Sequence, residues 1–259
     1  MAWFMGIDIG SGNSKGVLTK DGELTAYHVL PSGINYQVTA ERLIAELLAK
    51  AALTPEEVAY TIATGYGGGS VAFRNEQADD IRCCAHGINS VFPSARTVLD
   101  LQGVSSQVIR LTEKGQVTNF AVSEKCAAGS GRFLNVIANV LRIDLEDIGP
   151  LSLKAKNPVT FTTGCAVFGE SEAISRVSEG TAKEDILAGI HQALANKIAT
   201  LVDRVGLEKD CAVSGGGALN AGLVKSVADK LGIQLLVPPH PHLITALGAA
   251  IIAAEKKNN

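Results

Sequence analysis

The sequence has no apolar run of the roughly 18 residues that a membrane-spanning helix needs. Its apolar start, from Ala2 to Met5, has no basic segment before it and is interrupted by Asp8, so we expect no signal peptide. The apolar run at 244–254 is also too short to span a membrane, and a buried C-terminal helix explains it better. Long runs of Lys and Arg are missing too, and the formal net charge is −3. We therefore expect neither a membrane nor nucleic acid as the main partner.

The cysteines follow no Cys-x-x-Cys spacing, and their number, five, is odd. In a chain without an export signal this favours the reducing cytoplasm over a disulfide framework. The thiols are then free groups, metal ligands or redox groups. We expect a cytoplasmic protein.

Length and composition favour a folded α/β protein. A chain of 259 residues is long enough for one large domain or two small ones. Apolar residues make up 46% and charged residues 19%, so we expect a proper core and no disorder. Many of the 27 glycines are clustered, which suggests backbone that ligands approach closely.

A strand–turn–strand pattern occurs twice. The first copy has strands at 3–10, 16–19 and 24–30, and the second has an apolar strand at 97–103 followed by strands at 108–111 and 117–122. Aligning Asp8 with Asp100 also pairs Ser14 with Ser106. Helices are expected at 39–50, 132–141, 167–178, 183–205 and 218–231, with strands at 211–214 and 234–237. The repeat predicts two similar α/β halves facing each other, although chance similarity between hairpins is the alternative.

The first hairpin turn has the composition of a phosphate-binding loop. Its glycines let backbone N–H groups turn toward a phosphate, while hydroxyls and a Lys add donors and positive charge. The candidate residues are Ser11, Gly12, Asn13, Ser14 and Lys15. Asp8, at the strand end, suits an indirect hold on Mg²⁺ through water, and Asp100 is its counterpart. The turn is neither a Walker loop nor a Rossmann turn, because a strand follows it instead of a helix.

A third glycine-rich element lies between a strand and a helix. Gly215, Gly216 and Gly217 leave room for a purine or an α-phosphate at a helix N-terminus, and Asn220 follows them. Two hairpins and this loop resemble the superfamily of actin, hexokinase and heat-shock-protein ATPases. That resemblance implies ATP in a cleft between two ribonuclease-H-like halves. We assign 1–96 with the C-terminal helix 243–259 to one half, and 97–242 to the other.

Two cysteines precede expected helices. Cys126 comes before a Gly-Ser-Gly turn, and Cys165 follows Gly164 at the start of the second helix. Helix N-termini carry partial positive charge, which lowers a thiol's pKa and favours thiolate ligands of a cluster. Two structural cysteines are the alternative. One chain offers two such ligands, so a four-thiolate cluster would need two copies of the chain. Cys211 is expected in the core. Adjacent Cys83 and Cys84 suit chelation poorly, and we expect one of them to pack against the core.

Together these motifs resemble the activator ATPases of 2-hydroxyacyl-CoA dehydratases and the ATPase subunits of benzoyl-CoA reductase. The match is nearly end to end and includes 8–15, 63–67, 125–134, 165–172, the glycine triplet and 245–250. The resemblance implies a homodimer with one bridging [4Fe–4S] cluster on Cys126 and Cys165 of each subunit. ATP hydrolysis to ADP, with Mg²⁺, would change the angle between the helices at the cluster. A low-potential electron, received from a donor such as ferredoxin or flavodoxin, would pass to a dehydratase or reductase acting on an acyl-CoA.

The chain departs from that family in its second hairpin. The family usually has Asp-Ile-Gly-Gly-Gln-Asp, whereas this sequence has Asp-Leu-Gln-Gly-Val-Ser at 100–105. The Gln and second Asp are thus Val104 and Ser105, and Gly103 remains as the glycine for the second phosphate turn. His242 replaces a Gln common before the last helix. We expect ATP binding, with hydrolysis less secure, and two alternatives stay open: a small-molecule kinase of the superfamily and a non-redox ATP-dependent regulator.

Overall fold

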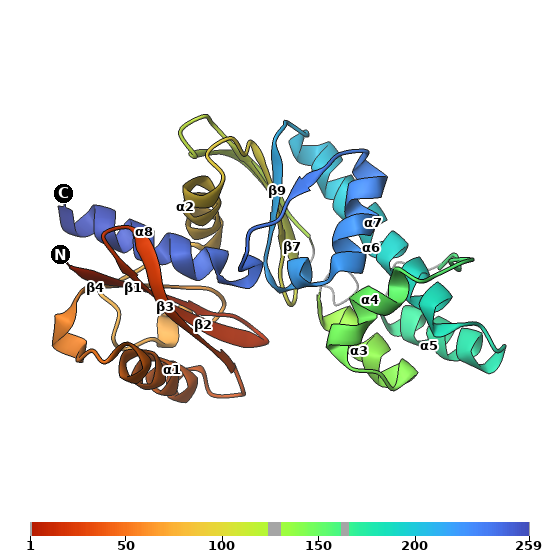
Figure 1. The fold of residues 1–259 in the computed structure, drawn as a ribbon, viewed down its shortest axis with the longest axis horizontal. Helices are drawn as coiled ribbons and strands as arrows, with labels where there is room; N and C mark the ends of the chain where they lie inside the picture. The colour runs from red at the N-terminus through yellow and green to blue at the C-terminus, as the bar shows by residue number, and fades with distance from the viewer. Residues whose placement is uncertain (1, 124–130, 162–165, 259) are drawn as a thin grey trace. The chain divides into compact units, whose positions relative to one another are not determined.

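The computed structural model describes residues 2–123, 131–161 and 166–258. The chain separates into two compact units. The first contains Met1–Ala95, Leu111–Val117 and Leu243–Asn259, and the second contains Arg96–Arg110 and Thr118–His242. Each unit has its own five-stranded mixed sheet (Figure 1).

The sheet of the first unit has the order β3-β2-β1-β4-β5. Its strands are β1 (Trp3–Ile9), β2 (Asn13–Lys20), β3 (Glu23–Pro31), β4 (Val58–Thr64) and β5 (Glu76–Gln77). The first three strands are antiparallel neighbours joined by tight turns, and β4 runs parallel to β1. β1 is apolar on both faces because helices cover both sides of the sheet.

Three helices cover this sheet, with α1 (Tyr36–Ala51) on one face and α2 (Asp80–Val91) and α8 (Ile244–Asn258) on the other (Figure 1). Short 3₁₀ turns, η1 (Pro55–Glu57) and η2 (Gly68–Ser70), flank β4. The backbones of β1, α2 and α8 approach so closely that a methyl group on Gly6, Gly87 or Gly248 would overlap a carbonyl oxygen of a neighbouring element. The C-terminal helix therefore packs directly against the sheet that the N-terminal strands form.

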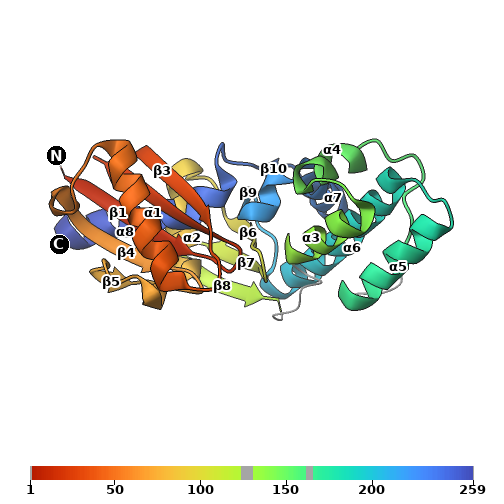
Figure 2. The ribbon, with the colours of Figure 1, turned by 90° about the horizontal axis from the view of Figure 1, so that it is seen from below.

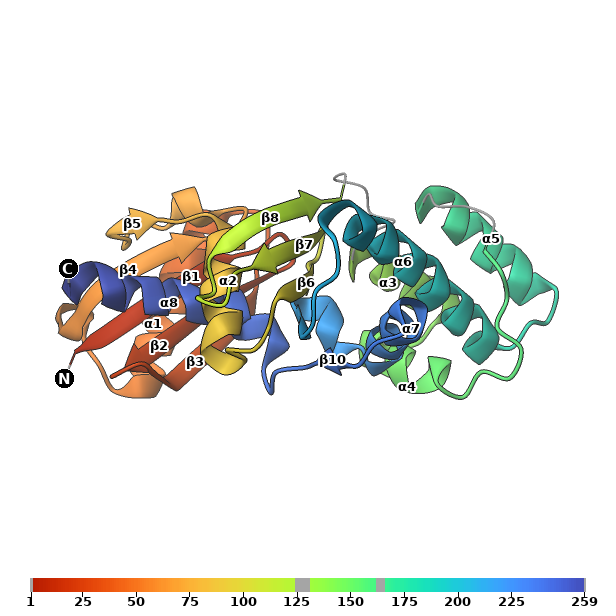
Figure 3. The same cartoon turned by 90° about the horizontal axis from the view of Figure 1, so that it is seen from above.

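The sheet of the second unit has the order β10-β9-β6-β7-β8. Its strands are β6 (Thr97–Leu101), β7 (Ser106–Leu111), β8 (Val117–Val122), β9 (Cys211–Ser214) and β10 (Leu235–Leu236). The helices are α3 (Gly131–Leu141), α4 (Ile148–Ser152), α5 (Ala166–Ser178), α6 (Lys183–Val205) and α7 (Ala221–Leu231), and η4 (Leu145–Asp147), η5 (Gly216–Leu219) and η6 (Pro241–Leu243) are short turns. α6 and α7 lie side by side, and α3 and α5 lie near α6 (Figures 2 and 3). One apolar cluster joins β6, β7 and β9 to these helices.

The two sheets share one plan, which confirms the α/β fold predicted from the repeat. The order β3-β2-β1-β4-β5 of the first sheet corresponds to the order β8-β7-β6-β9-β10 of the second. In each sheet the first strand of the repeat lies between its two antiparallel hairpin strands and two parallel strands. The register agrees as well, because Asp8 pairs with Lys15 and Asp100 pairs with Gln107 across their hairpins. Ile9 and Leu101 likewise pair with Ser14 and Ser106.

The predicted helices agree with the structure except around the glycine triplet. The helix expected from residue 218 begins at Ala221, because η5 makes a separate turn and Asn220 then caps α7 with its side chain. α2 was not predicted from the sequence. It buries both Cys83 and Cys84, whereas only one was expected to pack against the core. Across the part of the chain that the structure describes, no helix is long and apolar enough to cross a bilayer.

Candidate nucleotide-binding site

Asp8, next to the last residue of β1, is the carboxylate of the first hairpin. Its side chain is held in place, because Lys15 Nζ, from the opposite strand, donates to Asp8 Oδ2 at 2.9 Å. Gly65 follows β4 in the left-handed region, with φ of +82°. A methyl group there would overlap Asp8 Oδ1, so this position requires glycine for both conformation and space.

The turn after β1 exposes Gly12 and Asn13 and buries Ser14. The hydroxyl of Ser32 donates to the Gly10 carbonyl at 2.6 Å, and its oxygen lies 2.8 Å from Ser14 Oγ. Since a hydroxyl has one proton, Ser14 is the donor to Ser32. The Ser14 side chain therefore shapes the turn, and the exposed backbone at 11–13 is what this turn offers to an anion.

Asp100 in β6 is the carboxylate of the second hairpin, and it is fully buried. Ser214, on the parallel strand β9, donates to Asp100 Oδ1 at 2.9 Å. Gly215 follows with φ of +85°, and a methyl group on it would lie 2.8 Å from Asp100 Oδ1. The Ser214 hydroxyl thus fixes the position of a buried carboxylate, which suits a site for a hydrated cation.

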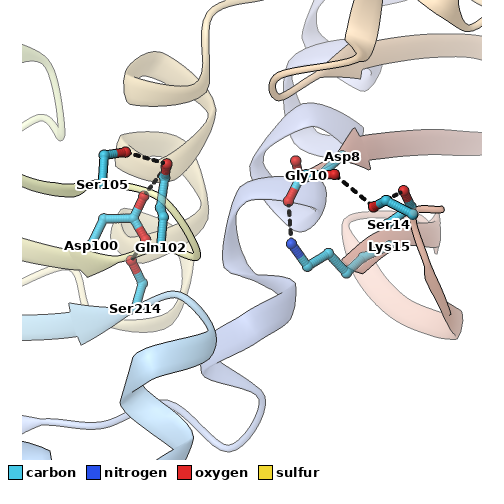
Figure 4. Close-up of polar contacts among 9 residues, drawn as sticks. Asp8, Gly10, Ser14, Lys15, Asp100, Gln102, Ser105 and Ser214 are labelled. Carbon is cyan, nitrogen blue, oxygen red and sulfur yellow. Dashed lines mark hydrogen bonds and ion pairs between the residues drawn. The ribbon is translucent and has the colours of Figure 1, made fainter. Parts of the chain in front are cut away.

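The two carboxylates have matching strand neighbours on the parallel-strand side, although among the described residues only Asp100 receives a hydrogen bond from its hydroxyl neighbour. Asp8 pairs with Thr64 and Asp100 with Ser214, and each hydroxyl residue precedes a glycine with positive φ. They differ on the hairpin side. Asp8 accepts from a cation, Lys15, whereas Asp100 accepts at Oδ2 from the neutral amide of Gln102 at 2.7 Å (Figure 4). The Oε1 of the same amide accepts from Ser105 Oγ at 3.2 Å.

The glycine triplet is structured by its neighbours. Gly215 N–H donates to the Pro241 carbonyl at 2.9 Å, which ties the triplet to the segment carrying His242. A side chain on Gly217 would meet Leu101, whereas Gly216 faces open space and is exposed. Gly216 is therefore the residue of the triplet over which a flat ligand has room.

Asn220 has two structural contacts beyond the triplet. Its Oδ1 accepts from Leu223 N–H at 3.0 Å as the cap of α7, and its Nδ2 lies 3.1 Å from His191 Nε2. His191 is buried, and this burial lowers its pKa from 6.5 to about 4. The imidazole is therefore neutral at pH 7, with Nε2 accepting from the amide, and its Nδ1 has no hydrogen-bond partner among the residues that the structure describes.

Cys126 and Cys165 lie outside the described residues, but the helices that follow them are described. α3 begins at Gly131 and α5 at Ala166. Their first turns touch, because a methyl group on Gly169 would lie 2.7 Å from Phe133 Cζ. The partial positive charge of these two helix N-termini would stabilise thiolate ligands or an iron–sulfur cluster nearby. Cysteine thiolates are the usual ligands of such a cluster, so the residues present fit it.

The described cysteines have a different character. Cys83, Cys84 and Cys211 are buried, and burial raises the pKa of Cys83 and of Cys211 to about 12. Thiols with such pKa values stay protonated and make poor ligands. Within residues 2–123, 131–161 and 166–258, no group of three His, Cys, Asp or Glu side chains could hold a metal ion.

The sequence did not indicate a role for Ser32, Gly65 or His191 in the candidate site. It drew attention to Gln102 only as part of the segment at 100–105 that differs from the family pattern. Ser32 and Gly65 act across the sheet on the first hairpin, at contacts that no local pattern reveals. For Gly65 a signal did exist, since the family match already included 63–67, but that match gave the glycine no role in the site. The likeness of 64–65 to 214–215 follows from the strand pairing and not from the sequence repeat.

The family model for BadF/BadG/BcrA/BcrD ATPases matches residues 5–253. This chain belongs to that family. The (R)-2-hydroxyglutaryl-CoA dehydratase activating ATPase of Acidaminococcus fermentans is 40% identical to this chain over 254 residues, 97% of each chain. The resemblance to dehydratase activators found in the sequence is thereby confirmed.

Solved structures agree with this membership. Component A of the (R)-2-hydroxyglutaryl-CoA dehydratase of A. fermentans superposes with a TM-score of 0.96 at 38% identity, covering all of both chains. The activator of the 2-hydroxyisocaproyl-CoA dehydratase from Clostridium difficile, with bound ADPNP, has a TM-score of 0.94 at 36% identity, covering 99% of this chain and 96% of that one. A glucokinase of the ROK family from Streptomyces griseus, at 12% identity and a TM-score of 0.61 over 98% and 100% of the chains, shares the actin-like ATPase fold alone.

Proposed function

We propose that this family ATPase is an ATP-dependent electron donor that activates a 2-hydroxyacyl-CoA dehydratase or a related reductase. The observation that carries the proposal is the pair of equivalent carboxylates, Asp8 and Asp100, each beside a hydroxyl residue and a left-handed glycine. Full-length relatives at 38–40% identity are named as dehydratase activators or activating ATPases. The nucleotide-bound relative supports ATP or ADP as the ligand here.

Each part of the candidate site has a role in this proposal. Asp8 and Asp100 hold Mg²⁺ through water, because strand-end carboxylates with fixed geometry suit a hydrated cation. Lys15 and the exposed turn at 11–13 attract phosphate oxygens, and Gly103 does so in the second hairpin. The open space at Gly216 leaves room for the adenosine. Gly215, Gly217 and Asn220 form the rest of the adenosine-binding loop. His242 lies on the segment whose Pro241 carbonyl accepts from Gly215 N–H.

The redox part of the proposal rests on Cys126 and Cys165. The contact of α3 and α5 at Phe133 and Gly169 supports a common location for the two cysteines. Two chains supply four thiolates, so we propose a homodimer that binds one [4Fe–4S] cluster. The cluster, when bound, supplies a one-electron centre, which a reduced ferredoxin or flavodoxin would recharge. The helix N-termini stabilise its negative charge.

The test uses chain reconstituted with iron and sulfide without oxygen, reduced by dithionite and mixed with a 2-hydroxyacyl-CoA dehydratase. We expect dehydration of the thioester only when Mg·ATP is present, with Mg·ADP giving none. ATP hydrolysis without any dehydratase activation, in protein that contains the cluster, would contradict the proposed function. Formation of a phosphorylated small molecule would point to a kinase instead.

A further inference from the structure

Gln102 occupies a position that the repeat treats differently in its two halves. Its counterpart in the first hairpin is Gly10, where a methyl group would lie 3.2 Å from Lys15 Nζ. In the first hairpin the space beside the carboxylate is thus used by a Lys amine, and in the second by the Gln102 amide. The amide connects Asp100 to Ser105 across the turn (Figure 4).

The main chain at Gln102 has a second role, at the start of α3. The Gln102 carbonyl accepts from Gly131 N–H at 3.1 Å, and the Gly103 carbonyl accepts from Arg132 N–H at 2.9 Å. These N–H groups belong to the first turn of a helix, where no intrahelical acceptor exists. One residue therefore touches the candidate Mg²⁺ carboxylate with its side chain and holds the first turn of α3 with its backbone.

We propose that Gln102 is a positioning residue that couples occupancy of the nucleotide site to α3. This inference rests on the proposed function. In the structure, the Gln102 amide donates to Asp100 Oδ2 at 2.7 Å. A hydrated Mg²⁺ held at Asp100 would offer donors to the same carboxylate, in competition with the amide. Loss of the amide contact would free the turn at 102–105, whose carbonyls at 102 and 103 accept from Gly131 and Arg132.

Coupling between separate sites requires an element with two states that a ligand can bias. In this proposal the two states are the Gln102 amide on Asp100, as in the structure, and the amide released from it. The consequence is directional: removing the amide should leave nucleotide binding in place while the response of α3 to nucleotide disappears. A carboxylate at position 102 would be repelled by Asp100, and it should place the turn in the released state before any nucleotide binds.

The experiment measures hydrogen–deuterium exchange of the amides at 131–135 in the full-length protein, with Mg·ADP, with a non-hydrolysable Mg·ATP analogue and without nucleotide. Gln102→Ala and Gln102→Glu are compared with wild type. The matched control is Gln37→Ala, because Gln37 makes its side-chain contact with Glu41 on the exposed surface of α1. Thermal unfolding of each variant is followed alongside, and Gln102→Asn replaces Gln102→Ala if the latter does not fold.

We expect wild type and Gln37→Ala to show a nucleotide-dependent change of at least threefold in exchange rate at Gly131 and Arg132. Gln102→Ala should bind the analogue within about threefold of the wild-type affinity and lose that change. Gln102→Glu should exchange without nucleotide as wild type does with it. An unchanged nucleotide response in Gln102→Ala, or no response in nucleotide-bound wild type, overturns the inference and leaves ATP binding intact. Failure of wild type to bind any nucleotide overturns the proposed function itself.

Discussion

At the residue scale, Gly65 is the position where a single methyl group should do most damage to the candidate site. Gly65→Ala adds the strain of a non-glycine residue at positive φ, about 1–2 kcal/mol, and also pushes against the Asp8 carboxylate. Gly22→Ala is the control, because Gly22 has φ of +87° and open space around it. We expect both variants to lose stability in urea unfolding, and only Gly65→Ala to lose ATP affinity, by tenfold or more. Equal ATP affinities of the two variants would contradict the placement of Asp8 in the site.

His191 gives a prediction for pH. Burial lowers its pKa from 6.5 to about 4, so between these pH values the unfolded chain binds a proton that the folded chain does not. The free energy of unfolding should therefore fall as the pH is lowered from 6.5 toward 4, by about 1.4 kcal/mol per pH unit from this residue. His191→Gln should remove this contribution, which urea unfolding at pH 8, 6 and 5 will measure. A pH dependence unchanged by the substitution would show that the imidazole is accessible to protons in the folded state.

At the scale of elements, the contact between α3 and α5 can be tested by enlarging one residue. Gly169→Leu places a side chain where Phe133 Cζ already lies, so the first turns of the two helices must separate. Ser175→Leu, on the exposed side of α5, is the matched control. We expect iron bound after anaerobic reconstitution to fall by at least half in Gly169→Leu and to stay at the wild-type level in Ser175→Leu. Full iron binding by both variants would contradict the proposal that these helix starts support the cluster.

The elements also show what the sequence could predict. α6 was located at 183–205 because its apolar residues recur with helical period over more than twenty residues. α2 was not, because its buried face is formed by small residues and includes Gly87, which the approach of α8 requires. The start of α7 was placed too early, since the sequence does not reveal that Asn220 leaves the helical conformation to cap it.

At the scale of the whole molecule, the repeated hairpin was enough to predict two α/β halves, because the spacing between Asp8 and Ser14 recurs between Asp100 and Ser106. The same alignment led to both carboxylates of the candidate site. The alignment could not reveal the hydrogen bond from the Gln102 amide to Asp100, or the one from Ser32 to the first hairpin turn. These contacts depend on side-chain directions in the folded sheet. The nucleotide and cluster ligands remain predictions.

The assignment of the cluster ligands predicts which cysteines matter to the assembled protein. Cys126→Ser and Cys165→Ser should each abolish iron binding after anaerobic reconstitution, with the fold and ATP binding largely kept. Cys211→Ala is the control, because burial raises the pKa of Cys211 to about 12 and keeps its thiol protonated. Iron content and far-ultraviolet circular dichroism of the three variants check this. Retention of the cluster in both serine variants would contradict the assignment.

The central claim is most directly tested on the unmodified protein, by its iron and acid-labile sulfide content after purification without oxygen, together with its mass in solution. The account predicts about four iron and four sulfide per two chains, in a protein with the mass of a dimer. A monomer without iron, even after anaerobic reconstitution, would contradict it and leave an ATPase of this family with no electron to transfer.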